Sequence, residues 1–220
     1  MMTRAVVAVV FGAVMLTTDV SSAQRTTSGP QASGESIPLE DRLMELGHKY
    51  DCYFTVEEGW QEAEAVNAFS TALVGRPAET GTLQQALDQI AKYVPSLRFE
   101  LRQQKDRPIV HVIDKRLDGQ GGYALARVIE SYEFSGTTGG LVADLGKRGI
   151  AISSQTVFAI GRPLAFDRDT RVTVKAAGLT VRRILSDGIP LKGYSRVIWT
   201  AATKLSAGAG TVVTFKGARS

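Results

Sequence analysis

The sequence is poor in residues that cross-link a chain or bind metal ions. It has one cysteine, Cys52, and two histidines among its 220 residues. A single cysteine excludes a disulfide within the chain, so we expect the apolar core alone to hold the fold. One cysteine and two histidines, without paired spacing, form no convincing set of metal ligands. Cys52 lies in the β-rich run of residues 52–56, which favours a small buried residue over a reactive thiol or an intermolecular bridge.

Motifs for catalysis and nucleotide binding are also missing. The sequence contains no phosphate-binding loop, dinucleotide fingerprint or serine nucleophile elbow. His48, Asp51 and Cys52 are close in sequence, but the histidine is predicted on a helix and the cysteine in a strand, so we expect no nucleophile–base pair. His111, in an apolar strand, is expected to be half-buried and hydrogen-bonded. The sequence therefore predicts no catalytic residue, cofactor, metal ion or nucleic-acid partner.

Only the N-terminus carries a long apolar run. Residues 5–16 are uninterrupted apolar residues that follow Arg4 and precede the small residues 21–23. This run suits a signal-peptide core and is shorter than a membrane span of about 20 residues. We expect residues 1–23 to be a signal peptide cleaved before Gln24, which makes the protein periplasmic or secreted with no transmembrane segment in the mature chain. A buried N-terminal helix is the alternative. Residues 24–35, polar and rich in Gly, Ser and Thr, are expected to be a flexible linker.

The positive net charge is unevenly distributed. Residues 36–117 carry 10 Lys and Arg against 13 Asp and Glu, whereas residues 118–220 carry 14 against 7. This asymmetry favours two domains, residues 36–117 and 123–220, joined by a linker at 118–122. The basic second part would be attracted to anionic partners, although the charge could also serve only solubility. The candidate binding residues are Lys147, Arg148, Arg168, Arg171, Arg182 and Arg183.

Hydrophobic periodicity predicts an α+β fold. Leu39, Leu43 and Leu46 fall at helical spacing, and Thr82 is a suitable N-cap for a second helix. Strands are expected at residues 52–56, 68–74, 97–101 and 109–113. Residues 57–67 are acidic and predict a loop or short helix. Their cluster of Glu57, Glu58, Glu62 and Glu64 is interpreted as a solvated face, because it lacks the order of ligands and glycines found in calcium loops.

The same order of elements recurs in the second half. Helices are expected at residues 138–148 and 180–186, with strands at 128–134, 150–160, 171–175, 196–203 and 211–216. Residues 46–49 (LGHK) match 145–148 (LGKR) at an offset of 99, and residues 82–87 match 180–185 at an offset of 98. The two matches favour an internal duplication. We expect tandem small two-layer modules, each with two helices packed on short mixed β-sheets, and each able to fold alone.

Two patterns in the first half resemble a known family. Residues 38–47 read Pro-Leu-x-x-x-Leu-x-x-Leu-Gly before a short strand, and residues 81–90 read Gly-Thr-Leu-x-x-Ala-Leu-x-x-Ile before a hairpin. They resemble the secretin and TonB short N-terminal domain; the second half is a looser match. The resemblance implies a small periplasmic α+β module of paired β-α-β units that contacts other proteins. No secretin channel or barrel segment follows in the sequence, so pore gating and transporter signalling are not carried over.

The expected function is therefore non-enzymatic. We expect a protein-interaction module that docks onto a partner in the bacterial cell envelope, through an exposed strand edge or a helix face. One alternative is an adaptor that binds anionic envelope polymers through the basic second module. A further alternative is a hydrolase whose site is assembled from residues that are distant in sequence.

Overall fold

The computed structural model describes residues 36–61, 72–75, 81–104, 107–154, 158–159, 162–163, 171–189, 191, 194–206 and 208–217. The predicted signal peptide and the linker at residues 24–35 lie outside this part of the chain. Arg168, Glu62 and Glu64 lie outside it as well.

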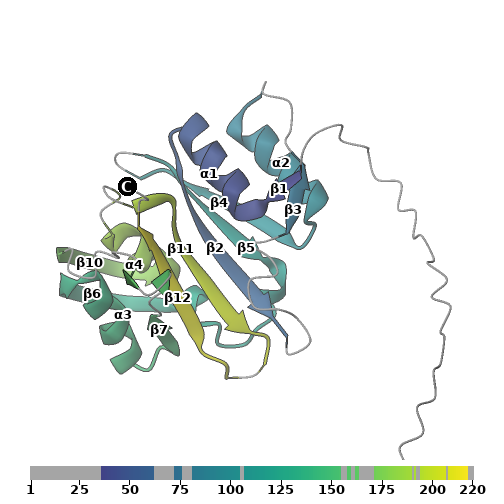
Figure 1. Cartoon of the computed structure of the whole chain (residues 1–220). Helices are drawn as coiled ribbons and strands as arrows, with labels where there is room; N and C mark the ends of the chain where they lie inside the picture. The colour runs from purple at the N-terminus through teal and green to yellow at the C-terminus, as the bar shows by residue number, and fades with distance from the viewer. Residues whose placement is uncertain are drawn as a thin grey trace, which may run out of the picture. The chain divides into compact units, whose positions relative to one another are not determined.

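The first half contains two helices among its described residues. Its elements are β1 (Ser36–Pro38), α1 (Leu39–Lys49), β2 (Tyr53–Trp60), β3 (Leu73–Gly75), α2 (Leu83–Tyr93), β4 (Leu97–Arg102) and β5 (Ile109–Asp114) (Figure 1). Helix α2 begins with a capping box, in which Thr82 accepts from the backbone N–H of Gln85 and the Gln85 side chain accepts from that of Thr82. The predicted N-cap is confirmed.

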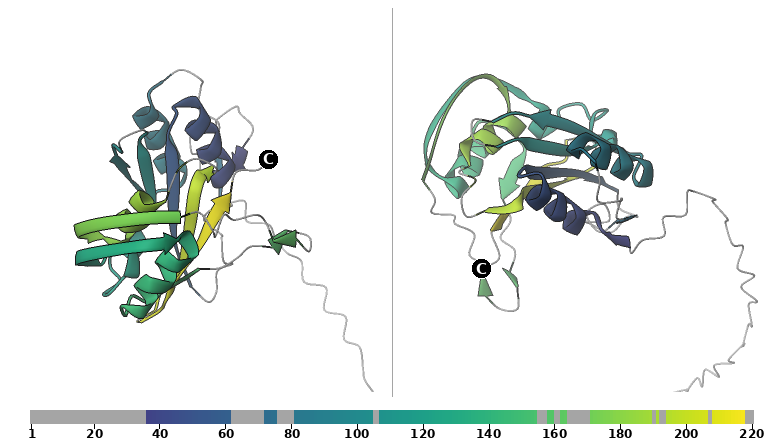
Figure 2. Two further views of the ribbon diagram at one scale, coloured as in Figure 1. Left: turned by 90° about the vertical axis from the view of Figure 1, so that its left-hand side faces the viewer. Right: turned by 90° about the horizontal axis from the view of Figure 1, so that it is seen from above.

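The described second half has the same kinds of element, with longer strands. After the short turns η1 (Lys115–Leu117) and η2 (Ala124–Ala126) come β6 (Val128–Thr137), α3 (Thr138–Lys147), β7 (Ile152–Ser154), β8 (Phe158–Ala159), β9 (Arg162–Pro163), β10 (Arg171–Thr180), α4 (Val181–Gly188), β11 (Tyr194–Lys204) and β12 (Thr211–Gly217). Strands β6 and β10 lie side by side as a long antiparallel ribbon (Figure 2). Thr180 caps α4 by accepting from the backbone N–H of Arg183, as Thr82 caps α2.

Strand pairing repeats between the two halves. The pair β1·β3 corresponds to β6·β10, and both pairs are antiparallel. The pair β2·β5 corresponds to β7·β12, and both are parallel. The pair β4·β5 corresponds to β11·β12, and both are antiparallel. Each half therefore places its strands in the same order and the same relative directions.

The two halves contribute to one mixed sheet. Its six strands lie in the order β4-β5-β2-β11-β12-β7, and the parallel pair β2·β11 joins the first half to the second. The α+β class is confirmed. Three strands of each half thus share this sheet, instead of forming separate sheets as the sequence predicts, whereas β1·β3, β6·β10 and β8·β9 are separate two-stranded sheets. All described residues belong to one compact unit, residues 32–220.

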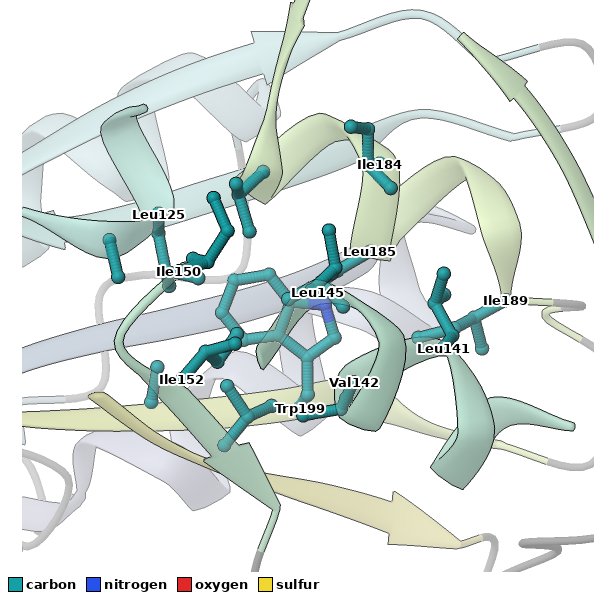
Figure 3. Packing of buried hydrophobic residues seen from close by; sticks show 14 of the residues in the cluster. Leu125, Leu141, Val142, Leu145, Ile150, Ile152, Ile184, Leu185, Ile189 and Trp199 are labelled. Carbon is teal, nitrogen blue, oxygen red and sulfur yellow. The ribbon is translucent and has the colours of Figure 1, made fainter. Parts of the chain in front are cut away.

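Helices cover opposite faces of the sheet. Side chains of a strand alternate between its faces, and neighbouring Tyr53 and Phe54 of β2 belong to two different buried clusters. The cluster of Phe54 contains the buried apolar side chains of α1 and α2. The cluster of Tyr53 contains those of α3 and α4, which surround the fully buried Trp199 of β11 (Figure 3).

The glycines of the repeated Leu-Gly motif occupy matching places. A Cβ atom on Gly47 in α1 would lie 3.0 Å from the carbonyl oxygen of Cys52, and one on Gly146 in α3 would lie 3.3 Å from that of Ile152. Each glycine thus allows its helix to lie close in space to the strand that comes next in the chain. Gly47 also faces Arg196 of β11, at 2.6 Å from the added Cβ to the Cβ of Arg196, so α1 packs against both halves.

The structure corrects one local prediction. Residues 57–60, expected in a loop or short helix with a solvated face, continue strand β2, and Glu57 and Glu58 are buried. The burial of Glu57 is compensated because its carboxylate pairs with Arg182 of α4. Acidic composition predicts exposure, but a partner 125 residues away reverses that preference.

Candidate interaction surface

Strand β4 is one end of the six-stranded sheet, with β5 as its neighbour and no second neighbour among the described strands. The backbone N–H of Lys115 donates to the carbonyl of Ser96, which makes these two residues a hydrogen-bonded pair. In an antiparallel ladder such pairs recur at every second residue, so the N–H and C=O groups of Phe99 and Leu101 point away from β5. The Leu101 side chain is also 52% exposed.

Strand β7 is the other end of the same sheet, and β12 is its only neighbour among the described strands. The carbonyl of Ala151 accepts from the backbone N–H of Thr211 in the parallel ladder. Groups that face the neighbour alternate along a strand, so the backbone of Ser154 points outward, and its side chain is exposed. Both ends of the sheet thus offer backbone donors and acceptors.

Charged side chains on β4 are already engaged on one face of the strand. Arg98 donates to both carboxylate oxygens of Asp118, at 2.7 and 2.8 Å, and also contacts Glu100. Arg102 pairs with Asp187 at the end of α4, at 2.7 Å. These contacts fix the charged face of β4 against the rest of the molecule. Leu101 lies on the opposite face of the strand, and its exposed side chain offers an apolar contact beside the outer edge.

The predicted anion-binding residues do not all share a surface. Lys147, Arg148, Arg171 and Arg183 are exposed. Arg148 pairs with Asp144 at 2.9 Å and its guanidinium lies 4.7 Å from the ring centroid of Tyr132. These exposed cations remain candidates for contact with an anionic partner.

The prediction of Arg182 as an anion-binding residue is wrong. Arg182 is only 6% exposed, and its guanidinium binds Glu57 of β2 through two hydrogen bonds, one of them 2.7 Å long. Glu57 is 0% exposed and accepts a further hydrogen bond from the Tyr123 hydroxyl at 2.8 Å. A charge neutralised inside the molecule cannot attract an external polymer, so Arg182 has a structural role between the halves.

Burial changes the acid–base properties of this cluster. It raises the pKa of Tyr123 well above its usual value, and the nearby charge of Glu57 adds to that effect. Burial alone would lower the pKa of Arg182, but the hydrogen bonds and charge of Glu57 outweigh it, so the pKa of Arg182 is raised. Arg182 therefore stays charged and Tyr123 stays neutral, which keeps this network of hydrogen bonds intact.

The thiol of Cys52 is held in an unreactive form. Cys52 is 0% exposed, which confirms the interpretation as a small buried residue, and burial raises the pKa of its thiol to about 11. Its Sγ lies 4.0 Å from the carbonyl oxygen of Leu46. His48 lies exposed on α1. Because the thiolate is the nucleophilic form, this environment suppresses the reactivity of Cys52.

His111 is more deeply buried than the sequence predicts, at 2% exposure. Its Nδ1 shares a 2.8 Å hydrogen bond with the Thr55 hydroxyl, whereas its Nε2 has no hydrogen-bond partner among the residues that the structure describes. Burial, reinforced by the charges of Arg182 and Arg102, lowers the pKa of His111 to about 3. The expected hydrogen bond is present at Nδ1, but the expectation of a half-buried side chain is wrong, and His111 is a neutral core residue.

The lowered pKa of His111 predicts a pH-dependent stability. Below the ordinary pKa of 6.5 the unfolded chain binds a proton at His111 that the folded chain excludes down to about pH 3. Stability from this residue is therefore complete above pH 6.5 and lost as the pH falls, by at most about 1.4 kcal/mol per pH unit. Urea unfolding across this window should show a shallower pH slope for His111→Gln than for the natural chain. Equal slopes would mean that His111 titrates alike in both states.

The described residues define an α+β protein with a mixed sheet open at both ends. None of its described helices is long and apolar enough to span a membrane, and the described residues hold no group of three or more His, Cys, Asp or Glu placed to bind a metal ion. Comparison of the chain with protein-family models, with curated proteins and with solved structures finds no match.

The sequence did not predict that Leu101 lies exposed beside the outer edge of the sheet, or that Glu57 pairs with Arg182. The alternation of residues 97–101 already placed Leu101 on the apolar face of a strand. Its position on the sheet's outer edge depends on the strand order, which has no local signature. The buried carboxylate of Glu57 could be suspected only from its place directly after the strand run of residues 52–56.

Proposed function

We propose that the chain is an exported, non-enzymatic protein-interaction module of the cell envelope, and that it docks partners along the outer edge of β4. The predicted signal peptide at residues 1–23 supports export to the periplasm or beyond. The resemblance of residues 38–54 and 81–113 to secretin and TonB short N-terminal domains supports a role in contacting other proteins. The neutral forms of Cys52 and His111 fit a protein without nucleophilic chemistry.

The open edge of β4 is the observation that carries this proposal. An extended segment of a partner can add to such an edge as a further strand, with backbone hydrogen bonds supplying affinity. Phe99 and Leu101 present the backbone groups, and the half-exposed Leu101 side chain supplies an apolar contact. The pair β2·β11 inside the molecule is an example of strand addition in the same sheet.

We further propose that the two halves are copies of one module. Three observations support the duplication: the repeated element order, the repeated strand directions, and the matching positions of Gly47 with Gly146 and of Thr82 with Thr180. The copies are tandem in sequence but share the six-stranded sheet.

An adaptor for anionic envelope polymers is the second candidate. The exposure of Lys147, Arg148, Arg171 and Arg183 favours it. The loss of Arg182 from the surface and the pairing of Arg148 with Asp144 reduce the charge available. Binding to a polymer would weaken steeply as salt is added, because each exposed contact is screened.

Replacing Leu101 with proline should abolish partner docking while leaving the fold intact. Proline removes a backbone N–H that points away from β5, and edge strands tolerate proline at such positions. Affinity capture from envelope extract with the mature chain should yield a protein that Leu101→Pro fails to retain. Leu101→Thr is the matched control, since it shortens the side chain but keeps the N–H, and it should retain most of the binding.

Thermal unfolding of each variant checks that the fold is preserved. Equal capture by the proline and threonine variants would contradict docking at β4. Two results together would favour the polymer adaptor. Moderate salt would abolish capture by all variants alike, and the substitutions Lys147→Glu and Arg183→Glu would abolish it as well.

A further inference from the structure

The two open ends of the sheet are not equivalent to each other. The repeated order and pairing relate the strands of the two halves. Strand β4 of the first half corresponds to β11 of the second half, and β2 of the first half corresponds to β7 of the second. Inside the molecule, β2 and β11 pair with each other to join the halves. Each open end therefore matches one side of a joint that the chain already forms internally.

The strand directions at the two ends are compatible with the same joint. Strands β2, β5 and β11 run in one direction, because their mutual pairs are parallel. Strands β4, β12 and β7 run in the opposite direction, since β4·β5 and β11·β12 are antiparallel and β12·β7 is parallel. A second copy shifted along the sheet would thus bring its β4 beside β7 in parallel, as β11 lies beside β2.

We infer that the partner of the β4 edge is a second copy of this chain, and that copies associate head to tail through β7 of one and β4 of the next. The inference rests on the proposed function, because it names the occupant of the same edge. Such an interface joins two different surfaces, so each added copy leaves one open end of each kind. The result is an open chain of copies with a continuous sheet.

The contact between copies is smaller than the internal joint. Strand β7 offers three residues, of which Ser154 directs its backbone outward, whereas the internal joint spans seven residue pairs. The buried ion pair has no counterpart either, because Gln84 of α2 stands in the sequence repeat where Arg182 of α4 stands. The association is therefore weak and depends on protein concentration.

Sedimentation of the mature chain, residues 24–220, across a concentration series tests the inference. The natural chain should form dimers and longer oligomers as its concentration rises. Leu101→Pro removes an outward N–H from β4, and Ser154→Pro removes one from β7. Each variant alone should remain a monomer at every concentration. Their equal mixture should form dimers and nothing larger, since only one intact β7 and one intact β4 remain per pair.

The mixture is the decisive sample, because dimers form only if both variants are folded. Dimers of Ser154→Pro alone would show that β4 pairs with β4, and oligomers of both variants alone would place the contact elsewhere; either result overturns the inference. A natural chain that stays monomeric overturns it too. In that case, a protein from the envelope captured by Leu101→Thr but not by Leu101→Pro would leave the proposed function standing.

Discussion

Residues 36–117 and residues 123–220, produced as separate chains, are expected not to fold, whereas residues 36–220 unfold cooperatively. Separation would expose the edges of β2 and β11, would break the ion pair of Glu57 with Arg182, and would uncover Tyr53 and Ile109, which pack in one apolar cluster with residues of the second half. The stabilisation from burying that apolar surface would be lost, and a half of this size has little stability to lose. Near-ultraviolet circular dichroism and urea unfolding of the three chains measure the effect.

The sequence repeat predicts the opposite outcome, with each half stable alone. Cooperative unfolding of either isolated half would therefore contradict the shared sheet as the source of stability. Mixing the halves provides the control: if β2 and β11 recognise each other, the equimolar mixture should regain the near-ultraviolet signal of the buried Trp199.

Removal of one partner from the buried ion pair should cost about 3–5 kcal/mol of stability. Glu57→Met leaves the Arg182 guanidinium buried without its carboxylate, and Arg182→Met leaves the carboxylate without its guanidinium. The double variant should lose much less stability than the sum of the losses in the two single variants, because apolar side chains of similar volume then face each other. Urea unfolding of the four chains gives this interaction energy directly.

Lys175→Met is the matched control for the loss of a charged partner. Lys175 pairs with Glu133 at 2.8 Å on the exposed face of the β6·β10 ribbon, where water replaces the lost contact. The free energy of unfolding of the Lys175→Met variant should hardly differ from that of the natural chain. If Arg182→Met were equally silent, the pair with Glu57 would not hold the halves together.

Much of the local structure could be predicted from the sequence. The helix expected at residues 138–148 is α3, Thr138–Lys147, and the helix expected at 180–186 corresponds to α4, Val181–Gly188. Their apolar residues recur at helical spacing and each follows a threonine cap, so the signal is local. The antiparallel strands of residues 97–101 and 109–113 were equally clear, because alternation or a continuous apolar run marks a strand.

The joint between the halves could not be predicted in this way. Parallel pairing of β2 with β11 links residues more than a hundred positions apart, and neither strand carries a local mark of its neighbour. The same distance hid the pairing of Glu57 with Arg182, so one was expected on a solvated face and the other on a basic surface. Both errors have one cause: tertiary contacts override the exposure that charge alone predicts.

The candidate docking edge of β4 could not be predicted from the sequence either. Residues 97–101 were expected to form a half-buried strand, which is correct, but the sequence does not say which strand ends the sheet. Leu101 becomes a candidate contact only once β4 is known to have a single neighbour among the described strands. The docking site is therefore a property of topology, whereas the residues that form it are ordinary strand residues.

Photo-crosslinking from position 101 in the producing cells tests the central claim, docking at the β4 edge, most directly. A photoreactive amino acid in place of Leu101 should give adducts with a protein partner, and a doubled mass containing residues of β7 would identify a second copy. The same probe in place of Val128, an exposed residue at the start of β6, is the control and should give no such adduct. Adducts from position 128 but none from position 101 would contradict the account.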